Sequence, residues 1–80
     1  MGVYEIISKN IRDLRCEKDM SISELAEKAD ISERNLYRIE AKEIHPGIET
    51  IMKLAMALSV EMKLITGDVS EELLEDDANG

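Results

Sequence analysis

The chain has 80 residues, enough for one compact domain but not two, and good helix formers dominate over only five Gly and Pro residues. It contains one cysteine and one histidine and no apolar run of about 20 residues, which argues against an internal disulfide, a metal cluster and a membrane span. The net charge of −8 opposes binding to nucleic acid, but residues 1–60 carry −2 of it and residues 61–80 carry −6. Without a signal-peptide pattern either, we expect a cytoplasmic, all-helical protein with no enzymatic activity, cofactor or metal.

Helical periodicity predicts a first helix over about residues 4–18 with a single apolar stripe. The residues of this stripe recur every three or four positions: Ile7, Ile11 and Leu14. Ser21 with Glu24 three residues later is the pattern of a capping box, in which both side chains accept hydrogen bonds from backbone amides at a helix start. We therefore expect a second helix that begins near Ile22 and ends near Asp30.

Ser32 is the expected N-cap of a third helix that runs from Glu33 to about Lys42. This helix must end before the segment 45–47, since Pro46 cannot continue a helix. A fourth helix follows directly, with apolar residues at the spacing of one buried face: Ile48, Ile51, Leu54, Ala55 and Leu58.

A short fifth helix over about residues 61–65 is expected to end at Gly67, which suits a left-handed C-cap. The sequence thus predicts a compact all-α domain of five helices over residues 1–67. The remaining residues, 68–80, form an acidic C-terminal tail with six acids and no base. This tail is either disordered or forms a short amphipathic turn.

The stretch 22–41 meets the demands of two helices joined by a tight turn. Ala26 is small where the two helices must approach closely, and Asp30 occupies a turn position that needs a left-handed backbone, which Asp tolerates. The positions that must rest on the core are all apolar: Leu25, Ala29, Ile31, Leu36 and Ile39.

On these residues the chain resembles the lambda-repressor-like helix-turn-helix family, also called the XRE or Cro family, over roughly residues 6–67. The matching segments are IRDLRCEKDMSISELAEKADIS, NLYRIE, HPGIETIMKLAMAL and SVEMKLITG, in the family's order. The resemblance implies a sequence-specific transcriptional regulator, expected to be a repressor, that binds double-stranded DNA as a homodimer with its third helix in the major groove.

The resemblance also implies which side chains contact DNA. Base-reading residues are expected on the third helix: Glu33, Arg34, Asn35, Tyr37 and Arg38. Phosphate ligands are expected at the starts of the second and third helices and before the fourth: Ser21, Ser23, Ser32, Lys42 and His45. The chain departs from the family at Ile22, where Gln is common, and at Glu43 and Ile44, where basic residues are frequent.

Arg15 and Glu40 match a pair that forms a salt bridge between the first and third helices in several phage repressors, and we interpret this pair as structural. Independent surface charges are the alternative. The candidate residues for a dimer surface lie near the C-terminus: Met62, Ile65, Val69, Leu73 and Leu74. Of these, Met62 and Ile65 also fit the core of the monomer. The alternative function is a protein-interaction module on the same fold, such as an antitoxin or an inhibitor of another regulator, whose acidic tail binds a basic partner protein.

Overall fold

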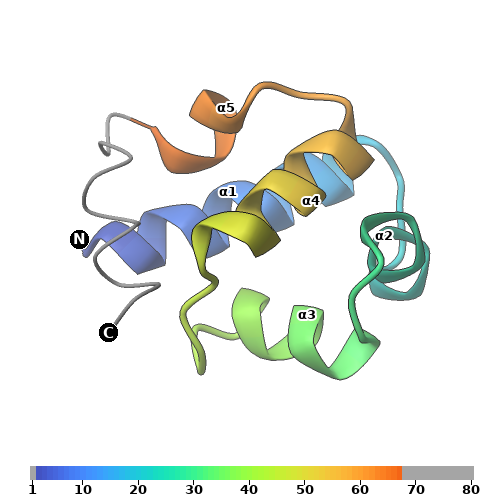
Figure 1. Ribbon diagram of the computed structural model, residues 1–80, viewed down its shortest axis with the longest axis horizontal. Helices are drawn as coiled ribbons and strands as arrows, with labels where there is room; N and C mark the ends of the chain where they lie inside the picture. Colours follow the sequence, from blue (N-terminus) through green and yellow to red (C-terminus); the bar gives the residue numbers. More distant parts are fainter. Residues whose placement is uncertain (1, 68–80) are drawn as a thin grey trace.

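The computed structural model describes residues 2–67, and all regular secondary structure within this range is helical (Figure 1). The helices are α1 (Val3–Glu17), α2 (Ile22–Ala29), α3 (Glu33–Glu40), α4 (Ile48–Leu58) and α5 (Met62–Thr66). The predicted all-α architecture is confirmed, and each predicted helix boundary lies within two residues of the observed one. The predicted tail lies outside the described residues.

All the described helices contribute to one hydrophobic core. Helix α4 lies across the centre of the molecule and packs against α1, α2 and α5, while α3 contacts α1 and α2 (Figure 1). The large apolar side chains with at most 2 % exposure are Ile7, Ile11, Leu25, Leu36, Ile39, Ile51, Leu54, Leu58 and Ile65. Burial of each such side chain stabilises the fold by about 1.5–3 kcal/mol. The predicted apolar stripes therefore face the core, although Leu14, Ile31 and Ile48 are only partly buried at its edge.

The first four helices end in the same way, at a residue in the left-handed conformation. These residues are Asp19, Asp30, Lys42 and Ser59, with φ between 54° and 65°. At the end of α2, the amides of Asp30 and Ile31 donate to the carbonyls of Glu27 and Ala26 over 3.2 and 3.0 Å, which is a Schellman motif. The left-handed Asp30 was predicted from the sequence. The left-handed Lys42 was not, and it explains why α3 stops at Glu40 instead of the predicted Lys42.

Gly67 ends α5, but in a conformation that differs from the expected left-handed cap. Its φ of 66° is positive as predicted, whereas its ψ of −131° makes it the mirror image of an extended residue. Glycine adopts this conformation readily because it has no Cβ. The end of α5 is also joined to α1, since the side-chain amide of Asn10 donates to the carbonyl of Ile65 over 2.9 Å.

Candidate nucleic-acid interface

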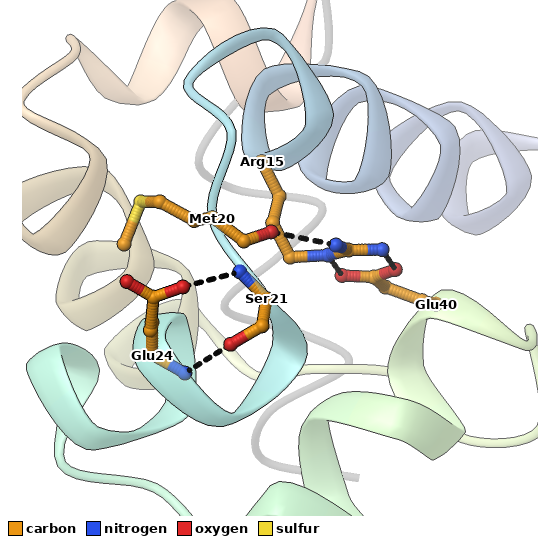
Figure 2. Close-up of polar contacts among 5 residues, drawn as sticks. All are labelled: Arg15, Met20, Ser21, Glu24 and Glu40. Carbon is orange, nitrogen blue, oxygen red and sulfur yellow. Dashed lines mark hydrogen bonds and ion pairs between the residues drawn. The ribbon is translucent and has the colours of Figure 1, made fainter.

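The start of α2 is held by the predicted capping box. The Ser21 hydroxyl oxygen accepts a hydrogen bond from the Glu24 amide, and the Glu24 carboxylate accepts one from the Ser21 amide, both over 3.0 Å (Figure 2). The backbone hydrogen bond from Ser21, followed by the contact with its side chain, lowers the pKa of Glu24. The carboxylate is therefore charged at neutral pH, where it also interacts favourably with the helix dipole.

The turn between α2 and α3 consists of residues 30–32. Asp30 ends α2, and the Ser32 side chain caps α3 by accepting a hydrogen bond from the Asn35 amide over 3.0 Å. Ala26 is 1 % exposed, as expected where the two helices pack closely. Two helices of eight residues each, joined by a turn of three residues, form a helix-turn-helix motif.

Helix α3 has one face in the core and one face in solvent. Leu36 and Ile39 are buried, as predicted. Most of the predicted base-reading residues are exposed on the other face: Glu33, Arg34, Asn35 and Tyr37. The Arg38 side chain is 41 % exposed and lies 3.7 Å from the carboxylate of Glu43, which is 53 % exposed. An ion pair this exposed contributes about 0–1 kcal/mol, so Arg38 can exchange it for another partner at little cost.

The predicted phosphate ligands are also solvent-exposed, but they lie in three separate places. Ser21 and Ser23 lie at the start of α2, Ser32 lies at the start of α3, and Lys42 and His45 lie in the loop before α4. The two capping hydroxyls accept hydrogen bonds within the protein but keep their own proton for donation. All five side chains are therefore accessible to a ligand.

The expected ion pair between Arg15 and Glu40 is present and joins α1 to α3. The Arg15 guanidinium binds both carboxylate oxygens of Glu40, Nε over 2.8 Å and Nη2 over 2.9 Å (Figure 2). Its Nη1 donates to the carbonyl of Met20 over 2.8 Å. The hydrogen bond to Glu40 raises the pKa of Arg15. Because the Arg15 and Glu40 side chains are only 14 % and 6 % exposed, this pair anchors α3 against α1 instead of acting as two independent surface charges.

Two features of this surface were missed in the sequence analysis. Arg12 lies one helical turn before Arg15 and lines a hollow that also includes Tyr37 of α3. Helical spacing from the Arg15 position was the signal that could have found it. The ring of His45 stacks on that of Tyr4, with centroids 4.0 Å apart and an angle of 3° between the planes. No local pattern connects two residues so far apart in the sequence.

Within residues 2–67, no group of three His, Cys, Asp or Glu side chains is arranged to hold a metal ion. None of the described helices combines the length and hydrophobicity of a membrane span. The helix-turn-helix and the exposed polar face of α3 give the described residues the architecture of a DNA-binding domain.

Comparison with known proteins gives the same class. Residues 11–65 match the family model described as Helix-turn-helix. The chain is 31% identical over 72 residues to the immunity repressor protein of Bacillus phage phi105, an alignment that covers 86% of this chain and 50% of the repressor. This chain thus spans about half the length of that curated relative.

Two solved structures have the same fold. The restriction-modification controller protein C.AhdI from Aeromonas hydrophila superposes with a TM-score of 0.75 at 24% identity, covering 78% of this chain and 94% of that one. A hypothetical transcription factor from Neisseria, NHTF, superposes with a TM-score of 0.79 at 25% identity, covering 90% of this chain and 83% of that one. The chain belongs to the lambda-repressor-like helix-turn-helix family of DNA-binding regulators, which is not a family of enzymes.

Proposed function

We propose that the protein is a transcriptional repressor that reads its operator with α3 in the major groove. The observation that best supports this is the division of α3 into two faces, with Leu36 and Ile39 in the core and a polar face in solvent. A recognition helix needs this arrangement, because the buried face holds it in place while the outer face contacts base edges. Because the proposed ligand is DNA, we expect the protein to act in the cytoplasm.

The chemistry of the outer face suits major-groove recognition. Arg34 and Arg38 can each donate two hydrogen bonds to the O6 and N7 acceptors of guanine, and Asn35 can pair with adenine. Glu33 can accept a hydrogen bond from the amino group of cytosine. The four side chains therefore have the functional groups to read a short sequence of mixed composition.

Selection of bound duplexes from a random pool tests this proposal, followed by titration of the enriched sequence. We expect Arg38→Ala to weaken operator binding by about 1–3 kcal/mol and to relax the preference at one base pair. We expect Lys42→Ala to weaken binding to all sequences equally and to lower the salt slope by about one, as for the loss of one phosphate contact. Substitutions of exposed residues usually change stability by no more than about 0.5 kcal/mol. Both variants should therefore lose affinity for DNA while they keep the stability of the wild type.

The matched control is Lys63→Ala, which also removes an exposed positive charge, but from α5 on the opposite side of the molecule from α3 (Figure 1). It should bind the operator almost as well as the wild type. If no sequence is enriched, or if Arg38→Ala binds like Lys63→Ala, α3 does not read bases. In that case the protein-interaction alternative, with a basic partner for the acidic tail, becomes the better explanation.

We further propose that the repressor acts as a homodimer, because one helix-turn-helix reads only a few base pairs. Of the residues considered from the sequence, Ile65 is fully buried and belongs to the core, and Met62 is partly buried against it. Two other apolar side chains are more available for a dimer contact: Met56 is 79% exposed and Leu64 is 57% exposed. Val69, Leu73 and Leu74 lie outside the described residues. Sedimentation equilibrium of Met56→Asp and of Leu64→Asp tests whether either side chain lies in the dimer interface, and an unchanged dimer in both variants would exclude both.

A further inference from the structure

A left-handed turn at the end of α3 brings the chain back to the side of Arg38. Lys42 has a φ of 65°. Its amide donates to the carbonyl of Ile39 over 3.1 Å, and the amide of Glu43 donates to the carbonyl of Arg38 over 2.9 Å, which is the pattern of a Schellman motif. Residues five apart do not share a face of a continuous helix, so the turn, and not helical spacing, places Glu43 beside Arg38. The apolar contact that often joins these two positions of the motif is replaced here by an ion pair.

The Glu43 carboxylate contacts the guanidinium of Arg38 at the nitrogen nearest the main chain. Its Oε1 atom lies 3.7 Å from Nε of Arg38. Within residues 2–67, the terminal nitrogens Nη1 and Nη2 of Arg38 donate no hydrogen bond to the protein. In Arg15, by contrast, Nε and both terminal nitrogens donate within the fold. Arg38 therefore keeps both terminal nitrogens for the O6 and N7 atoms of guanine while Nε faces Glu43.

The direction of an arginine side chain matters for the choice of base. Arginine has a long side chain with several rotatable bonds, and a freely rotating guanidinium can bind a phosphate as well as a guanine. A phosphate contact carries no sequence information. Arg34, one turn earlier on α3, is in no ion pair with any residue in the range 2–67, whereas Arg38 is paired with Glu43. Of these two arginines, Arg38 is thus the one whose direction is set by another residue of the described chain.

We propose that Glu43 is a positioning residue for base recognition, whose carboxylate holds Nε of Arg38 and directs the terminal nitrogens toward a guanine in the major groove. This inference rests on the proposed function. The ion pair is weak in water, but bound DNA excludes water from it and so strengthens the attraction between the two charges. The same carboxylate repels the phosphates of any duplex. Glu43 therefore weakens binding to DNA in general while it sharpens the choice of one base.

Two operators that differ at a single base pair test this role. The base pair is the one at which Arg38→Ala relaxes the preference, and the second operator has adenine there instead of guanine. The ratio of the two dissociation constants measures discrimination. Glu43→Gln keeps the shape of the side chain but removes its charge. It should lower the ratio about fivefold, the loss expected for one ion pair, and tighten binding to an unrelated duplex about twofold at low salt.

Glu49→Gln is the matched control, because it removes an exposed carboxylate whose partner is Lys53, 3.9 Å away, instead of Arg38. It should leave the ratio unchanged. In the Arg38→Ala background, Glu43→Gln should also leave the ratio unchanged, because the side chain that it positions is absent. Thermal unfolding should give Glu43→Gln the stability of the wild type, since both partners of the ion pair are exposed. A loss of discrimination without a loss of stability separates positioning from a structural role.

Several results would overturn the inference. If Glu43→Gln changes the affinity for both operators by the same factor, the carboxylate acts only through its charge. If Glu43→Gln alters the ratio in the Arg38→Ala background as well, Glu43 contacts a base itself. The inference is also wrong if the base preferred at the Arg38 position is not guanine. None of these results affects the proposed function, because Arg38→Ala still relaxes one base pair. A selection in which Arg38→Ala relaxes no base pair overturns both.

Discussion

The ion pair between Arg15 and Glu40 gives the sharpest test of how α3 is held in place. Glu40→Gln keeps the shape of the side chain but removes its charge, while Arg15 stays bound to the carbonyl of Met20. The Glu40 side chain is only 6 % exposed. Hydrogen bonds to charged groups contribute about 1.5–3 kcal/mol, and loss of one partner leaves the other charge poorly compensated. We therefore expect Glu40→Gln to destabilise the domain by about 2 kcal/mol, which lowers the Tm of a domain this small by roughly 8–16 °C.

The pair Lys9 to Asp13 is the internal control, because it has an N to O distance of 2.6 Å but side chains that are 59 % and 57 % exposed. Double-mutant cycles measured by urea denaturation should give a coupling energy of about 2 kcal/mol for Arg15→Met with Glu40→Gln. The cycle of Lys9→Met with Asp13→Asn should give no more than about 0.5 kcal/mol. Equal coupling energies in the two cycles would show that burial does not strengthen the interaction between α1 and α3, and our reasoning would be wrong.

Three further predictions concern the turn, the capping box and the tail. Asp30→Ala should destabilise the domain by about 1 kcal/mol, because Ala tolerates the left-handed backbone poorly, whereas Asp30→Gly should not; a urea titration in which both variants are equally unstable would contradict this. The pKa of Glu24, measured by NMR, should lie below the usual value of about 4.3 and rise in Ser21→Ala. The stability that the capping box contributes is then present in full at pH values above the usual pKa, and it is lost as the pH falls through the lower pKa of the folded state. A measured pKa at or above the usual value would exclude this. Truncation after Gly67 removes six acids and should tighten DNA binding at low salt by relieving like-charge repulsion, so unchanged affinity in a truncated protein of the same oligomeric state would argue against it.

Much of the fold could be predicted from the sequence because the signals for helices are local. A helix face repeats every three to four residues, and a cap involves residues three apart, as for Ser21 and Glu24. The start of α3 and its two faces followed from Ser32 and from the spacing of Leu36 and Ile39. The polar outer face of α3 was therefore evident before the tertiary structure was considered.

Helix ends were predicted less well, since a Schellman motif forms around a backbone conformation that several residue types can adopt. The sequence offered a specific signal for three helix ends: Asp30 and Gly67 at left-handed positions, and Pro46 beyond the third helix. Helices α1, α3 and α4 are followed within two residues by a left-handed residue, Asp19, Lys42 and Ser59 respectively, and none of these three stands out in the sequence. The left-handed backbone at these positions is stabilised by hydrogen bonds to the preceding turn, not by the side chain.

The tertiary structure alone decided which distant residues meet. Packing of α1 against α3 places Arg12 beside Tyr37 and buries the pair of Arg15 and Glu40. In each of these two pairs the residues are 25 positions apart in the sequence. Likewise, the sequence left Ile65 open between the core and a dimer surface, and only the packing of α5 on the core buries it. The sequence determined where helices form, through interactions within a few residues; the charged hollow and the burial of α5 depend on how those helices pack, which no local pattern encodes.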